Sequence, residues 1–421
     1  MKKDLQIIRQ LYINYIKPIM RIFVHDYAGH PFQVQLSREL ACRGHHIRHV
    51  HCTSFLTPRG ALSRRKSDPD TFESIGIGIR DQVAKYSFFK RRSQELEYAH
   101  LLCADVERFM PDAVLSSNTP LDVQAKLQAV CRKLGVPFVF WLQDIYSVGI
   151  ARVLRQRMPV VGAPVARYYR QLERRLLRRS DAVIAISEDF VRELDWGESD
   201  CPPIYVIPNW APIDEIPVLP KGNKWAKQHG LDKKKCVIYS GTLGLKHNPN
   251  LLLRLALEAR RDEDIQVVVV SEGIGAEWLK EQCAHLGLKN LTVLDFQPFD
   301  LLPQVLASAD LLVAILEPDA GVFSVPSKVL TYLCTARPLL LAVPRENLSA
   351  RVVRDAGAGI VVDPTDENAF VSAAMDLLGD PKSANQLGRN GRRYAERVFD
   401  IRAIGDRFES IIIDCMRRKG A

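Results

Sequence analysis

The sequence lacks the features that mark several classes of protein. No run of about 18 consecutive apolar residues occurs, so no segment is typical of a transmembrane helix. The nine cysteines are odd in number and scattered without paired spacing, which favours neither a disulfide framework nor a structural zinc site. No Ser/His/Asp triad spacing and no recognised nucleic-acid-binding module can be found. We therefore expect a protein of the reducing cytoplasm without a nucleic-acid partner.

The amino-terminal stretch also lacks the marks of a secretion signal. Residues 1–19 precede Met20, a second methionine, and have no long apolar core and no small-residue cleavage site. The stretch is short, mixed in composition and partly amphipathic. It is either a surface helix or the product of an upstream start, and we treat residues 1–19 as an N-terminal extension.

Positive charge is concentrated in one segment. Of the net charge of +9, residues 1–210 account for all, with 31 Lys+Arg against 22 Asp+Glu, whereas residues 211–421 hold 27 of each. The run from Arg152 to Arg179 contains nine arginines and a single acid, Glu173. Helical spacing from Pro164 to Arg179 separates an apolar face from a basic one. The apolar face is formed by Val165, Tyr168, Tyr169, Leu172 and Leu176, and the basic face by Arg167, Arg170, Arg174 and Arg178.

Such a helix has two plausible settings. It can lie on an anionic bilayer, where each cation near the surface contributes about 1 kcal/mol. Alternatively, its apolar face packs on the protein core and its arginines remain in water. We expect a mixture of the two, with Arg167, Arg170, Arg174 and Arg178 directed at an anionic membrane surface.

Short apolar strands alternate with helices along most of the chain. This alternation predicts an α/β fold with doubly wound parallel sheets covered on both faces, and 421 residues suit two domains of about 200 residues each. We expect strands at 21–24, 47–52, 113–116, 138–142, 182–186 and 204–207, then near 236–239, 266–270, 291–294, 311–315, 338–342 and 360–362. Helices are expected at 32–43, 95–109, 122–134, 164–179 and 251–258.

The domain limits follow from prolines between the two halves. Residues 208–220 hold four prolines and little periodicity, so residues 210–223 are the predicted linker. A first Rossmann-like domain is then expected at 20–209 and a second at 224–395. A C-terminal helix at 396–421 could cross back to the first domain. Facing sheets of this kind bind ligands at the carboxyl ends of their strands.

The most informative segment is a glycine-rich loop between a strand and a helix. Gly241, Thr242 and Gly244 follow the strand at 236–239, and Lys246 precedes the helix. Asn248 suits the N-cap and Pro249 the first helical position. Free backbone N–H groups, a helix dipole and one cation would suit an anion such as a nucleotide diphosphate. The alternative is an ordinary glycine turn with a solvated lysine.

Other candidate donor-binding residues follow neighbouring strands. Ser327 could cap the helix at 329–334, so that Lys328 faces the same anion. Glu272 and Gly273 follow the strand at 266–270, and their glycine-rich run permits close approach of backbone to a ligand. Glu317, followed by Asp319 in the same loop, could accept hydrogen bonds from sugar hydroxyls. A plain helix cap, a simple turn and a solubilising loop are the respective alternatives.

The first half offers candidates for an acceptor site. Gly29 and His30 follow the first strand and could contact an acceptor, although a lone histidine is more often structural. Asp144 follows the strand at 138–142 and is a candidate for catalytic or acceptor-orienting work. We expect no metal, because one of two tempting patterns has no acidic or cysteine partner at ligand spacing and the other has no strand before it. These patterns are the histidines at 45, 46, 49 and 51, and the Asp-x-Asp form of residues 68–70, which we place in a loop.

Taken in order, these motifs resemble the GT-B retaining glycosyltransferases of family four, and most of all bacterial enzymes of the colanic-acid and O-antigen type. The resemblance spans roughly residues 20–400. It is carried by His25 to Phe32, Ile207 to Trp210, Tyr239 to Lys246, Gln297 to Phe299 with Leu302 and Pro303, and Pro326 to Lys328 leading to Arg337 and Pro338.

The resemblance implies a sugar-nucleotide donor held mainly by the second domain, with Lys246 as its diphosphate contact. The chain departs from the family at several positions. Thr242 stands near the place of an arginine, and Glu317 has no glutamate eight positions later, because that residue is Val325. Thr331 stands where a glutamate usually meets the ribose. Gln143 and Asp144 occupy the region of a histidine that the family often has.

The function implied is transfer of a sugar, hexosyl or N-acetylhexosaminyl, from a nucleotide diphosphate to a lipid-linked glycan acceptor with retention, in surface polysaccharide biosynthesis. Asp144, Lys246 and Glu317 are the expected catalytic residues, and no cofactor is expected. The enzyme would be peripheral on the inner face of the plasma membrane. Two alternatives remain open: a sugar-nucleotide epimerase of the same fold, and a non-catalytic membrane-surface scaffold.

Overall fold

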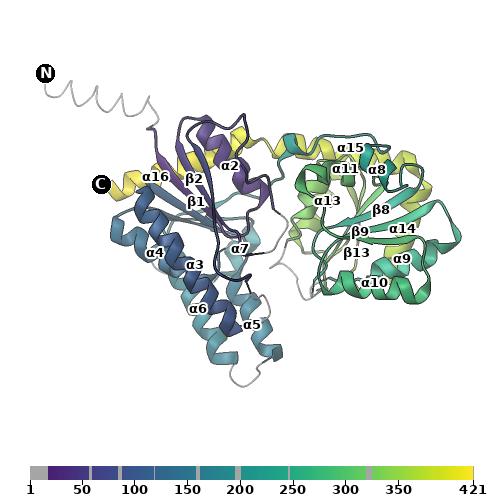
Figure 1. Ribbon diagram of the computed structural model, residues 1–421, viewed down its shortest axis with the longest axis horizontal. Coiled ribbons are helices and arrows are strands. Elements are labelled where there is room, and N and C mark those ends of the chain that lie inside the picture. Colours follow the sequence, from purple (N-terminus) through teal and green to yellow (C-terminus); the bar gives the residue numbers. More distant parts are fainter. Residues whose placement is uncertain are drawn as a thin grey trace.

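The chain folds into two α/β domains that lie side by side (Figure 1). The computed structural model describes residues 18–55, 59–83, 88–117, 119–157, 162–194, 201–244, 247–318 and 325–420. A seven-stranded sheet forms the first domain and a six-stranded sheet the second. Every pair of neighbouring strands in both sheets runs parallel, as expected from the alternation of strands and helices.

The first domain is a sheet with helices on both faces. Its strands are β1 (Arg21–Asp26), β2 (His46–Cys52), β3 (Phe72–Ile77), β4 (Ala113–Ser117), β5 (Phe138–Leu142), β6 (Ala182–Ala185) and β7 (Ile204–Val206). Its helices are α2 (Pro31–Cys42), α3 (Phe88–Phe109), α4 (Leu121–Leu134), α5 (Tyr146–Arg157), α6 (Gly162–Arg178) and α7 (Glu188–Glu193). The strand order is β3-β2-β1-β4-β5-β6-β7, so the chain direction across the sheet reverses between β1 and β4.

The second domain repeats the plan. Its strands are β8 (Lys235–Ser240), β9 (Ile265–Val270), β10 (Leu291–Leu294), β11 (Leu311–Ile315), β12 (Leu339–Ala342) and β13 (Gly359–Val362), in the order β10-β9-β8-β11-β12-β13. Its helices are α8 (Lys224–Gln228), α9 (Asn250–Glu258), α10 (Ile274–Leu286), α11 (Leu302–Ala307), α12 (Lys328–Leu333), α13 (Leu348–Ala356), α14 (Glu367–Gly379) and α15 (Pro381–Val398). Short 3-10 helices are η1 (Ile213–Glu215), η2 (Ala259–Arg261) and η3 (Phe299–Leu301).

Most predicted elements agree with the structure to within a residue or two, but two elements were not predicted and two helices begin elsewhere. The C-terminal helix predicted from residue 396 begins at Ile401, because the preceding helix runs to Val398. The strand β3 was missed because it is an edge strand in which only Phe72 is buried, so its apolar signal is weak. The helix α5 was missed because Gly149 interrupts its pattern. The helix α3 begins at Phe88, seven residues earlier than the predicted Glu95.

A tryptophan anchors the segment that joins the two domains. Trp210 is buried, and its indole Nε1 donates a hydrogen bond to Gln35 Oε1 at 2.8 Å. Its ring stacks on Trp141 with centroids 5.8 Å apart, and Phe408 of the last helix packs edge-on against both rings. The start of the predicted linker is therefore fixed to the core of the first domain.

The last helix, α16 (Ile401–Gly420), follows the second domain but packs on α2 of the first. Arg43, at the end of α2, pairs with Asp406 and with Glu409 at 2.7 Å each. Glu409 is buried and also accepts a hydrogen bond from His45 Nε2 at 3.2 Å. The chain thus crosses between the domains twice (Figure 1).

The carboxyl ends of the two sheets face each other. Asp189 lies in the first turn after β6, and its carboxylate pairs with the guanidinium of Arg351, which lies on the helix after β12. Val325, in the segment after β11, packs against the apolar core of the first domain. Loops at the ends of parallel strands therefore meet between the domains, where ligands of such sheets bind.

Buried histidines make the first domain sensitive to acid. Burial lowers the pKa of His25 to about 3 and the pKa values of His49 and His51 to about 4. A histidine whose folded pKa is depressed stabilises the fold above its unfolded pKa of about 6.5, and this stability is lost as the pH falls. We predict that each such histidine contributes about 1.4 kcal/mol of lost stability per pH unit below 6.5.

The measurement is urea unfolding between pH 7 and pH 5. His49→Gln should reduce the slope of unfolding free energy against pH by about 1.4 kcal/mol per pH unit, which corresponds to one proton. His46→Gln, which changes an exposed histidine of the same strand, is the matched control and should leave the slope unchanged. Equal slopes for the wild type and His49→Gln would contradict the account.

Candidate functional site

The predicted phosphate loop leaves the carboxyl end of β8 in a conformation that suits glycine. Gly241 has a φ of +123°, and its N–H donates to the carbonyl of Val270 at the end of β9 at 3.0 Å. The Tyr239 hydroxyl donates to the carbonyl of Thr242 at 2.8 Å and closes the turn. The side chain of Thr242 is exposed. Lys246, the predicted diphosphate contact, lies outside the described residues.

Lys328 lies directly beside this loop. Its ammonium sits over the ring of Tyr239, 3.6 Å from the centroid. A Cβ atom added to Gly241 would approach Lys328 Cε to 2.9 Å and Nζ to 3.0 Å, so glycine leaves the room that the lysine occupies. The predicted closeness of a second lysine to the glycine loop therefore agrees with the geometry.

Lys328 is positioned by Tyr332 and not, as predicted, by a helix cap from Ser327. In the described part of the chain, the Ser327 side chain makes no capping hydrogen bond, because the backbone of Ser327 is already helical. Instead, Tyr332 ties α12 to β8: its hydroxyl accepts from the N–H of Ser240 at 2.9 Å and donates to the Ser240 carbonyl at 3.0 Å. Thr331, one turn after Lys328, is half-buried on the same side of the helix.

The second glycine loop hydrogen-bonds to the first. The N–H of Leu243 donates to the Glu272 carbonyl at 3.3 Å, and the N–H of Gly275 donates to the Leu243 carbonyl at 3.0 Å. Gly273 has a φ of +115°, and a Cβ there would lie 3.1 Å from the Leu243 oxygen. The two loops thus form one backbone surface at the end of β8 and β9, while the Glu272 side chain is exposed.

His247 belongs to this site although sequence reasoning did not select it. Its Nδ1 accepts a hydrogen bond from the N–H of Gly244 at 3.0 Å. The amide of Gly244 is therefore engaged by an imidazole, and an anion could reach that amide only if His247 moved. Asn248 accepts from the N–H of Asn250 at 3.0 Å and Pro249 has helical angles, so the predicted start of α9 agrees with the geometry.

Glu317 follows β11 and is half-buried. The strand β11 lies next to β8, so Glu317 lies at the same edge of the sheet as the glycine loops. The chain direction across this sheet reverses between β8 and β11, which is where ligands of doubly wound sheets bind. Asp319, from the same predicted loop, lies outside the described residues.

In the first domain, Asp26 organises the loop that carries His30. The buried carboxylate of Asp26 accepts from the N–H groups of Ala28 and His30, and it pairs with His30 Nδ1 at 3.4 Å. Burial alone would lower the pKa of His30, but Asp26, with a smaller contribution from Asp144, raises it above its ordinary value. His30 also outweighs the effect of burial on Asp26, whose pKa is lowered. The loop therefore holds an acid–imidazole pair.

Gly29 has a packing role in the structure. It is buried with a φ of +79°, and its carbonyl accepts from the N–H of Gly60 at 2.9 Å. A Cβ on Gly29 would approach Leu62 to 2.8 Å. The glycine thus allows residues 59–62 to cover the loop, whereas its neighbour His30 keeps about a quarter of its side chain exposed.

Asp144 is half-buried between β5 and α5, and its charge acts on His30 and on Glu173. Glu173 is the lone acid of the arginine-rich run and is only 1% exposed. Its two carboxylate oxygens accept from the N–H groups of Tyr146 at 2.9 Å and Ser147 at 3.2 Å. Sequence reasoning noticed Glu173 as an exception in charge but gave it no role.

The basic helix α6 packs its apolar side on α4 and α5. Tyr169, Leu176 and Leu177 are buried, as the helical wheel predicts for two of them. Tyr168, which was assigned to the buried face, is 49% exposed, so that assignment was wrong by one position around the helix. Arg167, Arg170 and Arg178 are exposed and Arg174 is half-buried.

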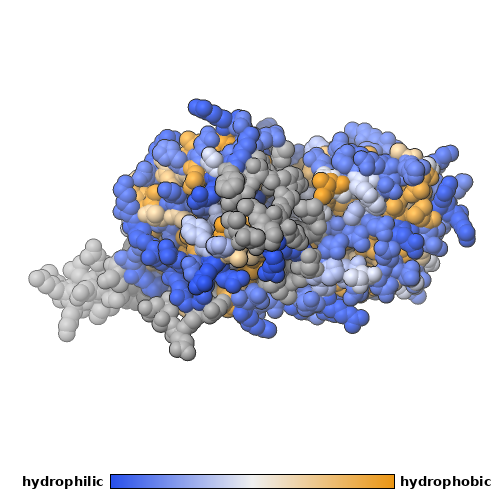
Figure 2. Space-filling view, turned by 90° about the horizontal axis from the view of Figure 1, so that it is seen from below, coloured by the Kyte–Doolittle hydropathy of each residue, from blue (hydrophilic) through white to orange (hydrophobic). Residues whose placement is uncertain are grey.

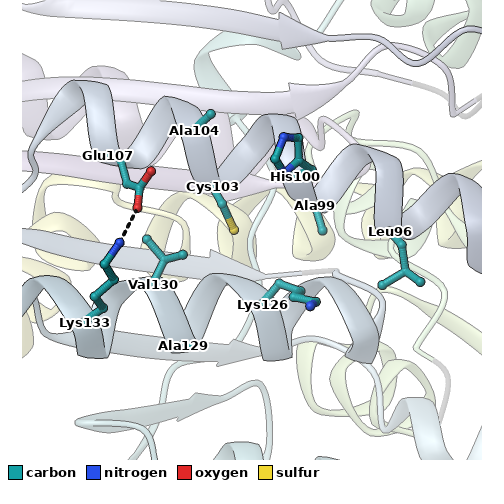
Figure 3. A pocket seen from close by; sticks show the side chains of 10 residues that line it. All are labelled: Leu96, Ala99, His100, Cys103, Ala104, Glu107, Lys126, Ala129, Val130 and Lys133. Carbon is teal, nitrogen blue, oxygen red and sulfur yellow. Dashed lines mark hydrogen bonds and ion pairs between the residues drawn. The ribbon is translucent and has the colours of Figure 1, made fainter.

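A groove elsewhere on the first domain does not coincide with these residues. It has a volume of 620 Å³ and lies between α3 and α4 on the helical layer of the first domain (Figure 3). Alanines and valine form much of its wall, and Glu107 pairs with Lys133 at 3.4 Å. Among the described residues, no three side chains of histidine, cysteine, aspartate or glutamate are grouped so that they could hold a metal ion. No helix in the same part of the chain is both long and apolar enough to cross a bilayer.

The role of Tyr332 gives a testable prediction. Tyr332→Phe removes the hydroxyl and leaves the buried N–H and carbonyl of Ser240 without it, which should cost about 1–3 kcal/mol of unfolding free energy. Tyr394→Phe, in which a half-buried tyrosine of α15 loses its hydroxyl, is the control and should cost less than about 0.5 kcal/mol. Chemical denaturation of both variants provides the test, and equal effects would contradict the role given to Tyr332.

Two family models match the chain, one in each sheet domain. Residues 30–210 match the model described as Glycosyl transferase 4-like domain, and residues 222–394 match Glycosyl transferases group 1. A curated relative from Escherichia coli, "Putative colanic acid biosynthesis glycosyl transferase WcaI", is 25% identical over 297 residues, or 70% of this chain and 72% of the relative. A GDP-mannose-dependent phosphatidylinositol monomannoside mannosyltransferase from Mycolicibacterium smegmatis is 27% identical over 44% of this chain and 50% of the relative.

Solved structures share the whole architecture. Sucrose-phosphate synthase from Thermosynechococcus elongatus superposes with a TM-score of 0.68 at 16% identity, covering 94% of this chain and 99% of that one. HepE from Anabaena, solved in complex with UDP-glucose, gives a TM-score of 0.68 at 15% identity over 94% and 100% of the two chains. The paired sheets, the returning helix and the matched models agree, and the chain belongs to the glycosyltransferases of the GT-B fold.

Proposed function

We propose that this glycosyltransferase moves a sugar, hexosyl or N-acetylhexosaminyl, from a nucleotide-diphosphate donor to a lipid-linked glycan acceptor, with retention, in surface polysaccharide biosynthesis. The observation that carries the donor half is the surface formed by the two glycine loops and Lys328. This surface lies at the carboxyl edge of β8 and β9, beside the point where the chain direction reverses. Backbone amides and a fixed cation at such an edge suit a diphosphate.

The proposed chemistry is stabilisation of a leaving diphosphate. The bond between the sugar carbon and the diphosphate oxygen breaks, a bond to the acceptor oxygen forms, and negative charge grows on the nucleotide. Lys328 lies at the loop, and Lys246 belongs to the same loop in sequence. Cations and amides that are already in place stabilise this charge better in the transition state than in the ground state. The proposal gives this role to lysines and amides rather than to a metal ion.

The acceptor half of the proposal places the acceptor against the first domain. His30 and Asp144 follow β1 and β5, whose ends face the second domain, and they are close enough for the charge of Asp144 to raise the pKa of His30. Glu317 follows β11, at the carboxyl edge of the second sheet. The name of the mycobacterial relative includes phosphatidylinositol monomannoside, and the name of the Escherichia coli relative includes colanic acid biosynthesis. Both names support an acceptor of this class.

The lysines provide the test of the donor site. Lys328→Ala and Lys246→Ala should each lower turnover by about 10²–10³, because each removes one preorganised contact to the leaving group. Lys280→Ala is the matched control, since this lysine of α10 pairs with Glu277 and Asp295 outside the site. The assay follows nucleotide release from a panel of sugar nucleotides in the presence of a lipid diphosphate, with and without a chelator.

Three results would contradict parts of the proposal. Wild-type turnover by both lysine variants would remove the donor site. Conversion of the donor to an epimer without any acceptor would favour the epimerase. Inverted anomeric configuration in the product, read by NMR coupling constants, would remove retention but leave the transfer.

We extend the proposal to the place of action, which is the cytoplasmic face of an anionic membrane. Arg167, Arg170 and Arg178 of α6 are exposed, and Val153 of α5 and Tyr168 of α6 are each 49% exposed. Figure 2 views the molecule from below the view of Figure 1, and its coloured part is a mostly hydrophilic surface with small hydrophobic spots. Cations around a few apolar side chains are typical of a surface that touches lipid head groups without spanning the bilayer.

The corresponding prediction compares two helices. Arg167, Arg170 and Arg178, changed together to alanine, should weaken binding to anionic vesicles by about 3 kcal/mol at low salt, and added salt should weaken binding by the wild type. The triple change of Arg389, Arg393 and Arg397 removes three exposed arginines from α15 of the second domain and should change binding little. Vesicle co-sedimentation measures both, and equal losses would show that net charge alone drives binding.

A further inference from the structure

The helix α5 begins without a capping side chain of its own. Ile145 precedes the helix, and its carbonyl accepts from Val148 and Gly149, so Ile145 occupies the N-cap position. An isoleucine side chain cannot accept a hydrogen bond. The first N–H groups of any helix have no partner inside it, and leaving them unpaired in a buried place is costly. Ile145 is buried, so this helix start needs an acceptor from elsewhere.

Glu173 supplies that acceptor from α6. One carboxylate oxygen accepts from the N–H of Tyr146 at 2.9 Å and the other from the N–H of Ser147 at 3.2 Å. A carboxylate at this end of a helix also meets the positive end of the helix dipole. The side chain is 1% exposed and points inward, whereas its arginine neighbours on α6 are mostly exposed. The lone acid of the basic run therefore has a structural reason to be acidic.

We propose that Glu173 is a positioning residue for the transfer reaction, because it holds the loop between β5 and α5 that presents Asp144. This inference rests on the role given above to Asp144. Asp144 is separated from the two capped amides by Ile145 alone, so fixing the first turn of α5 fixes the backbone on one side of Asp144. The end of β5 fixes it on the other side.

The electrostatics of the pair support the geometry. Burial raises the pKa of Glu173 to about 7, and the charge of Asp144 acts in the same direction, while the hydrogen bonds from Ser147 and Tyr146 oppose it. A buried carboxylate of this kind is retained at a cost, and a neutral apolar side chain would avoid that cost. In this position the carboxylate fixes the first turn of α5.

A double-mutant cycle tests the proposal in the full-length protein. Glu173→Gln should lower kcat at least tenfold with the donor KM unchanged within about twofold, because the donor contacts lie in the other domain. Asp144→Asn should lower kcat as well. If Glu173 acts through Asp144, the double variant should turn over no more slowly than Asp144→Asn alone.

A matched control separates positioning from a general loss of a helix cap. Ser187 caps α7, which follows the neighbouring strand β6, by accepting from the N–H of Phe190 at 3.3 Å. Ser187→Ala should lower the thermal midpoint, and its effect on kcat should multiply with that of Asp144→Asn. If Glu173→Gln does not yield folded protein, Glu173→Asp can replace it, because it keeps the charge on a shorter side chain. Combined with Asp144→Asn, it should lower kcat no further than Asp144→Asn alone.

The outcomes decide separately between this inference and the proposed function. Wild-type kcat for folded Glu173→Gln, alongside a reduced kcat for Asp144→Asn, would overturn the positioning role alone. Effects of Glu173 and Asp144 that multiply would do the same. Wild-type kcat for Asp144→Asn would remove the role of Asp144 and that of Glu173 together, while continued sugar transfer would leave the glycosyltransferase function standing.

Discussion

The hydrogen bonds between Tyr332 and Ser240 are the interaction on which the candidate donor site depends. They tie α12 to the last residue of β8, and this places Lys328 over the ring of Tyr239 and beside Gly241. The first glycine loop follows this strand, and the backbone of its residue Leu243 hydrogen-bonds to the second glycine loop. One buried hydroxyl thus ties a helix to the strand that the first glycine loop follows, and backbone hydrogen bonds join the second loop to the first. The anion-binding surface is therefore a property of backbone geometry more than of any one exposed side chain.

Much of the fold could be predicted from the sequence because parallel sheets leave a strong pattern. Strands buried on both faces are short continuous apolar runs, and glycines such as Gly135, Gly287 and Gly357 end helices in the left-handed conformation that suits them. Elements without those signals were missed. The edge strand β3 buries only Phe72, and α5 owes its start to Glu173, which comes 27 residues after Tyr146. No local pattern reports a cap supplied from such a distance.

The candidate site was predictable in position and less so in detail. Because every strand of a parallel sheet ends at one edge, the loops after β1 and β5 lie at that edge of the first sheet and the loops after β8, β9 and β11 at that edge of the second. The described residues chosen from these loops follow those strand ends, whereas Lys246 lies outside the described residues. The sequence did not indicate that His247 engages the amide of Gly244, or that Asp26 raises the pKa of His30, because both contacts depend on loop geometry. Ser327 showed the limit of the cap rule, since a preceding residue with helical angles removes the capping geometry.

The central claim is that the two glycine loops bind the diphosphate of a nucleotide sugar. Amide hydrogen exchange in the presence of UDP, GDP, ADP or dTDP tests it most directly, because the proposed ligands are backbone N–H groups. The account predicts slower exchange at Thr242, Gly273 and Ile274 with at least one nucleotide, because the N–H groups of Gly241, Leu243, Gly244 and Gly275 already donate within the protein. Other loops should exchange as before. Unchanged exchange at both loops with every nucleotide, or protection confined to the groove between α3 and α4, would contradict it.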